Sequence, residues 1–311
     1  MKSQIRETRR EKPEIVSSML DSAKKYEARW ERLGESMIES LNKGQWPRVM
    51  AVGPAIPGGL KHLYGENFGH TGRPGKVFEV TCRWDGTLDA EGLGSVFYGV
   101  KHLRIKRMEI WGPDFSTQKT TLEQIRAANI EGFGEVEVRR ASTSGNGAAE
   151  LKTVEAGVLC CSDSRVQAYQ IFNGSNVVVV SNAGNILSPV AVETFSGLVQ
   201  AGVPILAVLG HSGCGAVGAA IEENNEPMLA GIVRKVRANI LMGGTEGRLG
   251  KERHNALVEY IMLGRSGDTG ESSGAEGMRL QQLIKERDVE RMAFFLDLSD
   301  GTVSDISSRL R

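Results

Sequence analysis

Apolar runs and helical patterns alternate along the second half of the chain. Each run is short, rich in valine, leucine and isoleucine, and ended by glycine or polar residues, as buried strands are. The runs are 158–160, 177–180 and 204–209. A helical pattern lies between the last two, with Ser188 as its N-cap, Pro189 as its first residue and Gly202 at its far end. Alternation of this kind predicts parallel β-α-β units.

Later segments continue the alternation. We expect helices at 216–223, 228–241 and about 275–286, a strand at about 292–298, and a turn at Asp300-Gly301. The predicted fold class is therefore α/β, with a mainly parallel four- to five-stranded sheet and flanking helices. An N-terminal helical and strand-containing region precedes this sheet.

The first 45 residues form a segment of their own. Apolar residues recur there at intervals of three or four among charged ones, which indicates one or two amphipathic helices. These residues are Ile15, Met19, Ala23, Tyr26, Trp30 and Leu33. The pattern predicts a helical segment over 1–45.

The next segment, 46–150, is a mixed region for which the sequence indicates no role. Alternation over 76–84 ends at Asp85-Gly86, which favours a strand and a hairpin. A helix is expected at 121–129 and a strand at 135–138, and the Ser- and Gly-rich stretch 142–148 is typical of a linker. We therefore expect a boundary near 150, with 151–311 as the last domain. No internal repeat is evident.

Composition and charge narrow the classes of protein to which the chain could belong. Lys+Arg and Asp+Glu are equal at 38 each, so no net field attracts nucleic acid or an anionic membrane. No apolar run approaches the ~18 residues of a membrane span, and the first residues lack the apolar segment of a signal peptide. The adjacent Cys160 and Cys161 point to opposite faces of a strand and are poor disulfide partners. We expect a soluble, cytoplasmic protein with cysteines used for metal binding or catalysis.

Two cysteines and a histidine follow the predicted strands. Cys161 and His211 end apolar runs, and Cys214 stands where the next helix begins. In parallel sheets functional groups lie at the carboxyl ends of strands, so these side chains are expected to converge. A helix N-terminus lowers the pKa of a thiol, which favours the thiolate at Cys214. Two thiolates and one imidazole suit zinc (Zn²⁺), and three protein ligands leave the open position of a catalytic site.

The second half of the chain resembles the β-class carbonic anhydrase family, from about residue 155 to the last residue. The resemblance rests on three motifs in this order: Cys161-x-Asp163-x-Arg165, Ser181-Asn182-Ala183-Gly184-Asn185 and His211-x-x-Cys214. The second motif of the family usually begins with a basic residue, where this chain has Ser181. Any ion pair that other members make at that position is therefore in doubt here.

The resemblance implies a lyase that reversibly hydrates carbon dioxide to bicarbonate and a proton by zinc-bound hydroxide. Cys161, His211 and Cys214 would be the zinc ligands. Asp163 would accept a hydrogen bond from the hydroxide, and Arg165 would hold Asp163 through a charge-assisted pair. The family also implies a homodimer or larger homo-oligomer, with the N-terminal helices across a partner subunit. Packing on the chain's own core is the alternative reading of those helices.

Several alternatives stay open. In some family members the matching aspartate swings onto the zinc, so Asp163 could close the site if Arg165 released it. The same zinc hydroxide could attack carbonyl sulfide or carbon disulfide. The zinc could also be structural, in a non-catalytic assembly protein. A proton shuttle is not assigned, and His254 is a candidate only because it is the one histidine after the motifs.

A nucleotide-binding interpretation is weaker. Gly213-x-Gly215-x-x-Gly218 formally matches a dinucleotide fingerprint. That fingerprint also requires an acidic residue about 20 positions further on, where Arg234 and Lys235 stand inside a helical pattern. It gives no task to the residues of the first motif, and close helix packing accounts for the glycines better.

Overall fold

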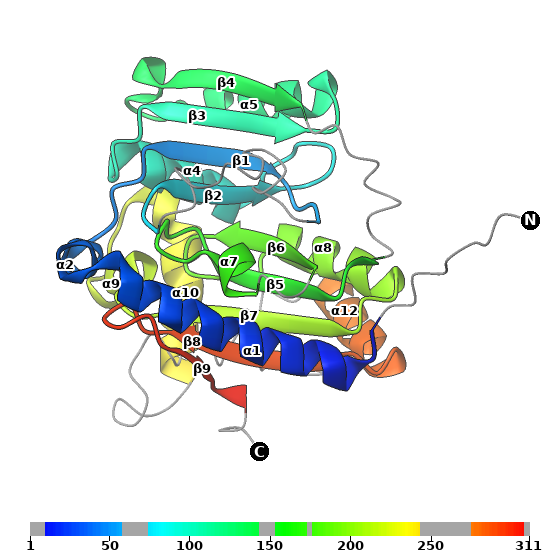
Figure 1. Ribbon diagram of the computed structural model, residues 1–311. Coiled ribbons are helices and arrows are strands. Elements are labelled where there is room, and N and C mark those ends of the chain that lie inside the picture. The colour runs from blue at the N-terminus through cyan, green and yellow to red at the C-terminus, as the bar shows by residue number, and fades with distance from the viewer. Residues whose placement is uncertain (1–9, 58–73, 143–152, 173–175, 243–274, 308–311) are drawn as a thin grey trace, which may run out of the picture.

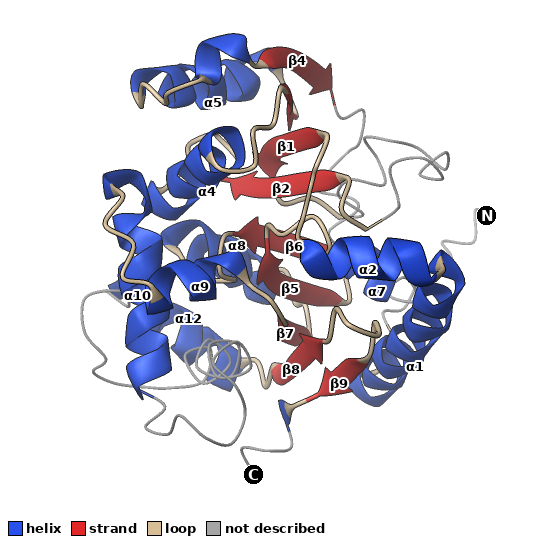
Figure 2. Ribbon diagram, turned by 90° about the vertical axis from the view of Figure 1, so that its left-hand side faces the viewer, coloured by secondary structure: helices blue, strands red, loops and turns tan. Residues whose placement is uncertain are grey.

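Two β-sheets lie side by side in the computed structural model, which describes residues 10–57, 74–142, 153–172, 176–242 and 275–307 (Figures 1 and 2). The first sheet has the order β2-β1-β3-β4 and the second the order β6-β5-β7-β8-β9. All pairings are parallel except that of β8 with β9. The strands are β1 Val49–Pro54, β2 Val77–Cys82, β3 Arg107–Gly112, β4 Glu137–Ser142, β5 Ala156–Cys161, β6 Val177–Asn182, β7 Ile205–His211, β8 Glu290–Leu296 and β9 Val303–Asp305.

Helices cover both faces of the second sheet and one face of the first (Figure 2). The α-helices are α1 Lys12–Trp30, α2 Glu35–Lys43, α4 Ala90–Lys101, α5 Phe115–Ala127, α7 Ala168–Ile171, α8 Pro189–Gln200, α9 Gly215–Ile221, α10 Ala230–Met242 and α12 Ala275–Glu286. Single 3-10 turns are η1 Glu31–Leu33, η2 Phe133–Glu135 and η4 Pro227–Leu229. Among the described helices, none is both long and apolar enough to cross a bilayer.

The predicted α/β class with a mainly parallel sheet is confirmed. Side chains of β5 and β7 alternate between two cores, one against α1 and α7 and the other against α8 and α12. Helix α8 begins as expected, with the Ser188 hydroxyl accepting a hydrogen bond from the Ala191 amide at 3.4 Å. The helix expected at 275–286 has these bounds, and Val303 pairs with Leu296 after the turn.

Helix α1 packs on the chain's own core, which was the alternative to packing across a partner subunit. Its buried face contributes to the cluster that contains Val158 and Leu209 of the second sheet. Trp30 fits against Gly301, where a Cβ atom would lie 2.1 Å from the indole. Of the apolar residues that indicated this helix, Leu33 lies beyond its end and is half-buried.

The hairpin favoured at Asp85-Gly86 is wrong. Residues 77–82 form a strand parallel to β1, and the turn leads instead into α4, which the sequence pattern did not indicate. The Asp89 side chain caps this helix by accepting a hydrogen bond from the Gly92 amide at 2.7 Å. Glycines at 92, 94 and 99 make this helix hard to predict from the sequence, because glycine has a low helix propensity.

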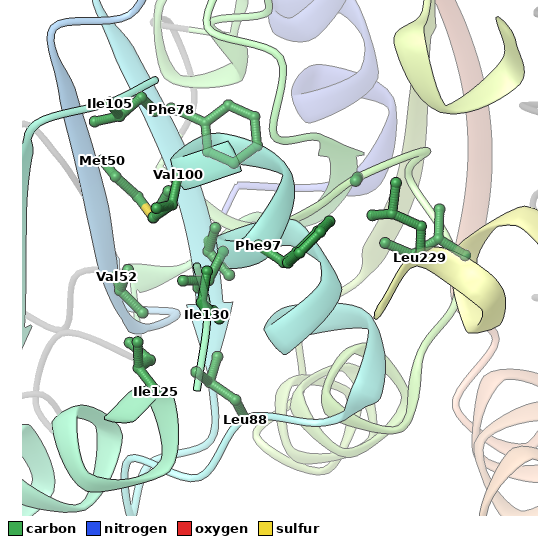
Figure 3. Packing of buried hydrophobic residues seen from close by; sticks show 14 of the residues in the cluster. Met50, Val52, Phe78, Leu88, Phe97, Val100, Ile105, Ile125, Ile130 and Leu229 are labelled. Carbon is green, nitrogen blue, oxygen red and sulfur yellow. The ribbon is translucent and has the colours of Figure 1, made fainter. Parts of the chain in front are cut away.

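The two sheets share a core. One cluster of buried side chains joins Phe78 of β2 and Phe97 of α4 to Leu229 and to Ile232 of α10, and Figure 3 shows part of it. An ion pair between Lys235 and Glu91 at 2.8 Å also joins α10 to α4. The first sheet is thereby fixed beside the carboxyl ends of the second, where the predicted metal ligands lie.

Glu79 of β2 is buried, and burial raises its pKa to about 8. Because the folded carboxyl keeps a proton that the unfolded chain releases above about 4.5, the free energy of unfolding falls as pH rises from about 4.5 to about 8. Glu79→Gln removes this loss, so its melting temperature relative to wild type should be higher at pH 8.5 than at pH 5. The difference corresponds to a few kcal/mol, on the order of 1.4 per pKa unit.

Thermal unfolding followed by circular dichroism at the two pH values measures this effect. Glu123→Gln on the exposed surface of α5 is the matched control and should show no such pH-dependent gain. An equal effect of Glu79→Gln at both pH values would contradict a buried, protonated carboxyl.

Candidate metal centre

Three metal-binding side chains meet at the carboxyl edge of the second sheet. Cys161 is the last residue of β5 and His211 the last of β7, and these strands are parallel neighbours. Cys214 is the N-cap of α9, at the end of a tight loop from β7. The ligand atoms of the three residues lie within 4.8 Å of one another, and all three are buried. The structure therefore brings the predicted ligands together.

The imidazole of His211 is oriented for metal binding. Its Nδ1 lies 2.9 Å from the carbonyl oxygen of Ser212, to which an Nδ1–H donates. That tautomer leaves a lone pair on Nε2, which is buried and has no hydrogen-bond partner. A buried nitrogen without a partner is costly unless another group takes its lone pair, and a metal ion is such a group.

The loop after β6 supports the sulfur of Cys161. The backbone amide of Gly184 donates to Cys161 Sγ at 3.3 Å, which favours the thiolate. Gly184 has a φ of +84°, a conformation that side chains disfavour. The Asn182 side chain holds this turn through two hydrogen bonds with the backbone of Ile186, both at 2.7 Å. The second sequence motif thus shapes the wall of the site.

The two thiols are coupled. Their sulfurs lie 4.0 Å apart, and a hydrogen bond from Cys214 lowers the pKa of Cys161 well below its ordinary value. The same contact and burial raise the pKa of Cys214. The helix N-terminus acts as expected, since the backbone amide of Val217 lowers the Cys214 pKa, but the hydrogen bond with Cys161 and burial outweigh this effect. A first charge on Cys161 also opposes a second one nearby. A cation held between the sulfurs would favour both thiolates.

Asp163 and Arg165 form a buried bidentate pair. Arg165 Nε donates to Asp163 Oδ1 at 2.9 Å and Nη2 donates to Oδ2 at 2.6 Å. Burial alone would raise the pKa of Asp163, but the hydrogen bonds from Arg165 and nearby positive charge lower it below its ordinary value. The carboxylate is therefore charged and held in place. This is the open arrangement, with Asp163 on Arg165.

The guanidinium of Arg165 also ties the site to its surroundings. Nη2 donates to the carbonyl of Gly213, between the two ligands His211 and Cys214, and Nη1 donates to the carbonyl of Leu41 in α2, both at 2.9 Å. Beside it, the Gln45 side chain accepts hydrogen bonds from the amide and hydroxyl of Ser164 at 2.9 and 3.1 Å. The N-terminal helices thus help to fix the loop that carries Asp163.

A small pocket opens beside these residues. Cys161 and Asp163 lie on its wall, which is otherwise mostly apolar. The other lining residues are Gln45, Phe78, Tyr98, Ala183, Gly215, Ala216, Ala219, Leu229, Ile232 and Val233. Burial and the negative charge of Asp163 raise the pKa of Tyr98 to about 12, so its hydroxyl stays protonated. Strand β2 of the first sheet supplies Phe78, and helix α4, which follows β2, supplies Tyr98.

The structure brings together the five residues that the sequence predicted: Cys161, Asp163, Arg165, His211 and Cys214. Of these, Cys161 and Asp163 line the pocket, and no sequence signal pointed to its Gln45, Phe78 or Tyr98. His254, the proton-shuttle candidate, lies outside the described residues.

Two of the three glycines of the nucleotide fingerprint serve the turn and the packing beside Cys214. Gly213 has a φ of +62°, a conformation that favours glycine. A Cβ atom on Gly215 would lie 2.6 Å from the Tyr98 hydroxyl, whereas one on Gly218 would meet nothing within 4 Å. Local geometry thus accounts for Gly213 and Gly215 without a bound nucleotide.

Comparisons with known proteins point to one family. A family model described as carbonic anhydrase matches residues 156–303. Carbonic anhydrase 2 of Mycobacterium tuberculosis is 32% identical over 123 residues, which are 36% of this chain and 59% of that protein. A carbonic anhydrase of Mycolicibacterium smegmatis is 35% identical over 100 residues, 30% of this chain and 48% of that protein. The chain thus spans only 59% or less of these relatives.

Solved structures give more distant likenesses. The β-carbonic anhydrase CcaA aligns with a TM-score of 0.41 and 19% identity over 51% of this chain and 75% of that one. A structure from work on two tetrameric β-carbonic anhydrases of Sordaria macrospora aligns with a TM-score of 0.36 and 18% identity, over 61% and 97%. The family model and the curated relatives thus confirm the resemblance to carbonic anhydrases for residues 156–303.

Proposed function

We propose that the chain is a zinc-dependent carbonic anhydrase that interconverts carbon dioxide and bicarbonate. The observation that carries the proposal is the convergence of two sulfurs and a partnerless Nε2 within 4.8 Å, beside a pocket that also exposes Asp163. This donor set suits zinc, and three protein donors leave a position for solvent. The match of residues 156–303 to the carbonic anhydrase family model supports the same reaction.

Bound at these donors, zinc would supply a water acidic enough to serve as a nucleophile near neutral pH. The task of the protein is then to orient that nucleophile. Asp163 Oδ1 accepts two hydrogen bonds from Arg165, one from its backbone amide and one from Nε. Oδ2 accepts one, from Nη2, and keeps a lone pair with which it can accept a hydrogen bond from the nucleophile. The carboxylate thereby directs the nucleophile's remaining lone pair into the pocket.

The pocket suits a very small, apolar substrate. Its walls are mostly alanine, valine, leucine, isoleucine and aromatic side chains. Its volume, counted as space open to the centre of a water molecule, is about 20 Å³, enough for water or a molecule not much larger. Carbon dioxide fits this description. Once it has become bicarbonate, the apolar wall disfavours the charged product and so favours its release.

Metal analysis tests the ligand set. We expect close to one zinc per purified chain, and we expect Cys214→Ser to lose it, because a serine hydroxyl is a far weaker zinc ligand than a thiolate. Cys160→Ser is the matched control: Cys160 is adjacent to a ligand but lies 3.3 Å from the Ser181 hydroxyl instead. Its zinc content should be unchanged. Retention of zinc by Cys214→Ser would refute the site.

Stopped-flow measurement of carbon dioxide hydration tests the reaction. Rapid hydration by the zinc-loaded chain is the expected result. Release of sulfide from carbonyl sulfide or carbon disulfide without hydration would assign the site to a sulfur analogue. Zinc binding with neither activity would indicate a structural metal in an assembly protein. Either of these two results would overturn the proposal.

Arg165→Lys tests the positioning of Asp163. Lysine keeps the charge but cannot make the two parallel hydrogen bonds or reach the carbonyls of Leu41 and Gly213 at the same time. Hydration should fall roughly ten- to a hundredfold in kcat/KM with zinc retained. Arg83→Lys, in an exposed ion pair with Glu193, should leave the rate unchanged. Unchanged hydration in Arg165→Lys would show that the pair is not required.

A further inference from the structure

The four strands of the first sheet repeat the arrangement of the metal-binding sheet. The order β2-β1-β3-β4 corresponds strand for strand to β6-β5-β7-β8, and every pairing in both sets is parallel. In each set the chain enters at an inner strand, moves to one edge and then crosses back to build the other side. The strand β9 extends the second set alone.

The register between strands is repeated as well. In both sets, residues at the same place in adjacent strands lie opposite one another. The matching pairs are Val49–Val77 and Ala156–Val177, Met50–Met108 and Gly157–Leu206, and Arg107–Glu137 and Ile205–Glu290. The two sets therefore agree in strand order, direction and register, as two copies of one unit would.

The helix that follows the edge strand is also repeated. α4 follows β2 and α8 follows β6, and each has 12 residues. Each is capped by a side chain that accepts a hydrogen bond from the amide three residues on, Asp89 in α4 and Ser188 in α8. Strand and helix together form the edge at which the two units meet (Figures 1 and 2).

Equivalent residues meet across this junction. Thr81 and Ser181 are the fifth residues of β2 and β6, and the Thr81 hydroxyl accepts a hydrogen bond from the Ser181 amide at 2.8 Å. In a two-fold symmetric dimer, equivalent residues contact each other only at the symmetry axis. The contact therefore marks an approximate two-fold axis inside one chain.

Contacts away from this axis are reciprocal. Ala183 follows β6 and its amide donates to the Ser95 hydroxyl of α4 at 2.9 Å. Arg83, which follows β2, pairs with Glu193 of α8 at 2.6 Å. Ser95 and Glu193 lie six and five residues beyond their N-caps, so the two contacts match within one position. Such reciprocity is the mark of an isologous interface between two copies of one unit.

The first unit has lost the metal donors. Counting along the matched strands places Pro54 at the position of Cys161, Pro113 at that of His211 and Ser116 at that of Cys214. Proline offers no side-chain ligand at all. Among the residues that the structure describes, only the second unit offers this set of donors.

The metal-free unit completes the pocket of the other. Phe78 from β2 and Tyr98 from α4 line it together with Cys161 and Asp163. A Cβ atom on Gly215 would lie only 2.6 Å from the Tyr98 hydroxyl. Gly215 directly follows Cys214. The first unit therefore touches the start of the helix that carries a metal ligand.

We infer that residues 49–142 are an internal repeat of the metal-binding unit that has lost its metal site and takes the place of a partner subunit. Phe78 and Tyr98 then form the wall that a partner subunit would otherwise supply. Each chain completes its own pocket and holds one metal site in its two units. This inference rests on the proposed function only in taking carbon dioxide hydration as a readout. A second chain is not needed to complete the site.

A set of variants in one helix tests the contact. Gly215→Ala puts a methyl group against Tyr98 Oη and should reduce kcat/KM roughly ten- to a hundredfold and shift the visible spectrum of the cobalt-loaded chain. Tyr98→Phe in the same chain removes that oxygen and leaves the next ring atom 3.4 Å away, so the double variant should recover most of the loss. Gly218→Ala meets nothing within 4 Å and should change neither readout.

Mixing separates one chain from two. Gly215→Ala chains are co-expressed with chains that carry both Tyr98→Phe and Cys214→Ser. If each chain completes its own site, hydration per zinc stays at the level of Gly215→Ala. Recovery to the level of the double variant would show that the wall comes from another chain and would overturn the inference. Absence of any rescue within one chain would also overturn it.

Failure of the proposed reaction would look different. A wild-type chain without hydration would remove the proposed function, yet the cobalt spectra and melting temperatures of the same variants would still report whether Tyr98 meets Gly215 in one chain. Rescue of both by Tyr98→Phe in the single chain, and not in the mixture, would support the inference without any activity.

Discussion

A single buried guanidinium holds the candidate site together. Arg165 lies between the metal-ligand loop, the carboxylate of Asp163 and the end of α2, and it donates hydrogen bonds to all three. A charge taken out of water is tolerated only if its hydrogen bonds are made. The fold must therefore keep the Gly213 and Leu41 carbonyls in place, and any movement of α2 or of the loop is transmitted to Asp163.

The half of the fold that carries the candidate metal site could be predicted from the sequence because its signals are local. A buried strand followed by a ligand, the cap at Ser188 and the spacing between His211 and Cys214 are each visible within a few residues. Parallel pairing then places the ends of β5 and β7 at one edge, so the convergence of Cys161 and His211 follows from topology.

The first sheet and its helices were predicted only in part. The strand within 76–84 corresponds to β2, the helix at 121–129 overlaps α5 and the strand at 135–138 overlaps β4, whereas α4 and the strand order were missed, for two physical reasons. Helix α4 is rich in glycine and is stabilised by its Asp89 cap and by burial, neither of which local propensity measures. The repeat is one of pairing and register, and matched positions of β1 and β5 share no identical residue. Both strands need only apolar residues of suitable size, so many sequences fit one topology. Phe78 and Tyr98 could not be placed near the metal ligands without that topology.

Loss of the donors in one unit is compatible with the symmetry of the junction. The hydrogen bonds and the ion pair that join the units come from residues of β2, β6, α4 and α8 or directly after these strands, and neither Pro54 nor Pro113 takes part in them. A proline at position 54 or 113 therefore removes a ligand and leaves the interface as it was. The first unit was free to change its loops while Phe78 and Tyr98 kept their place at the pocket.

One carboxylate serves helices of both units. Asp89 Oδ1 accepts from the Gly92 amide of α4 and Oδ2 accepts from the Val190 amide of α8, at 2.7 and 2.9 Å. The first unit thus supplies part of what keeps the first turn of α8 in the second unit formed, and Phe97 and Leu229 pack in one core. The chain should consequently melt in one cooperative transition, in which damage to the unit without metal lowers the population of the fold that holds it.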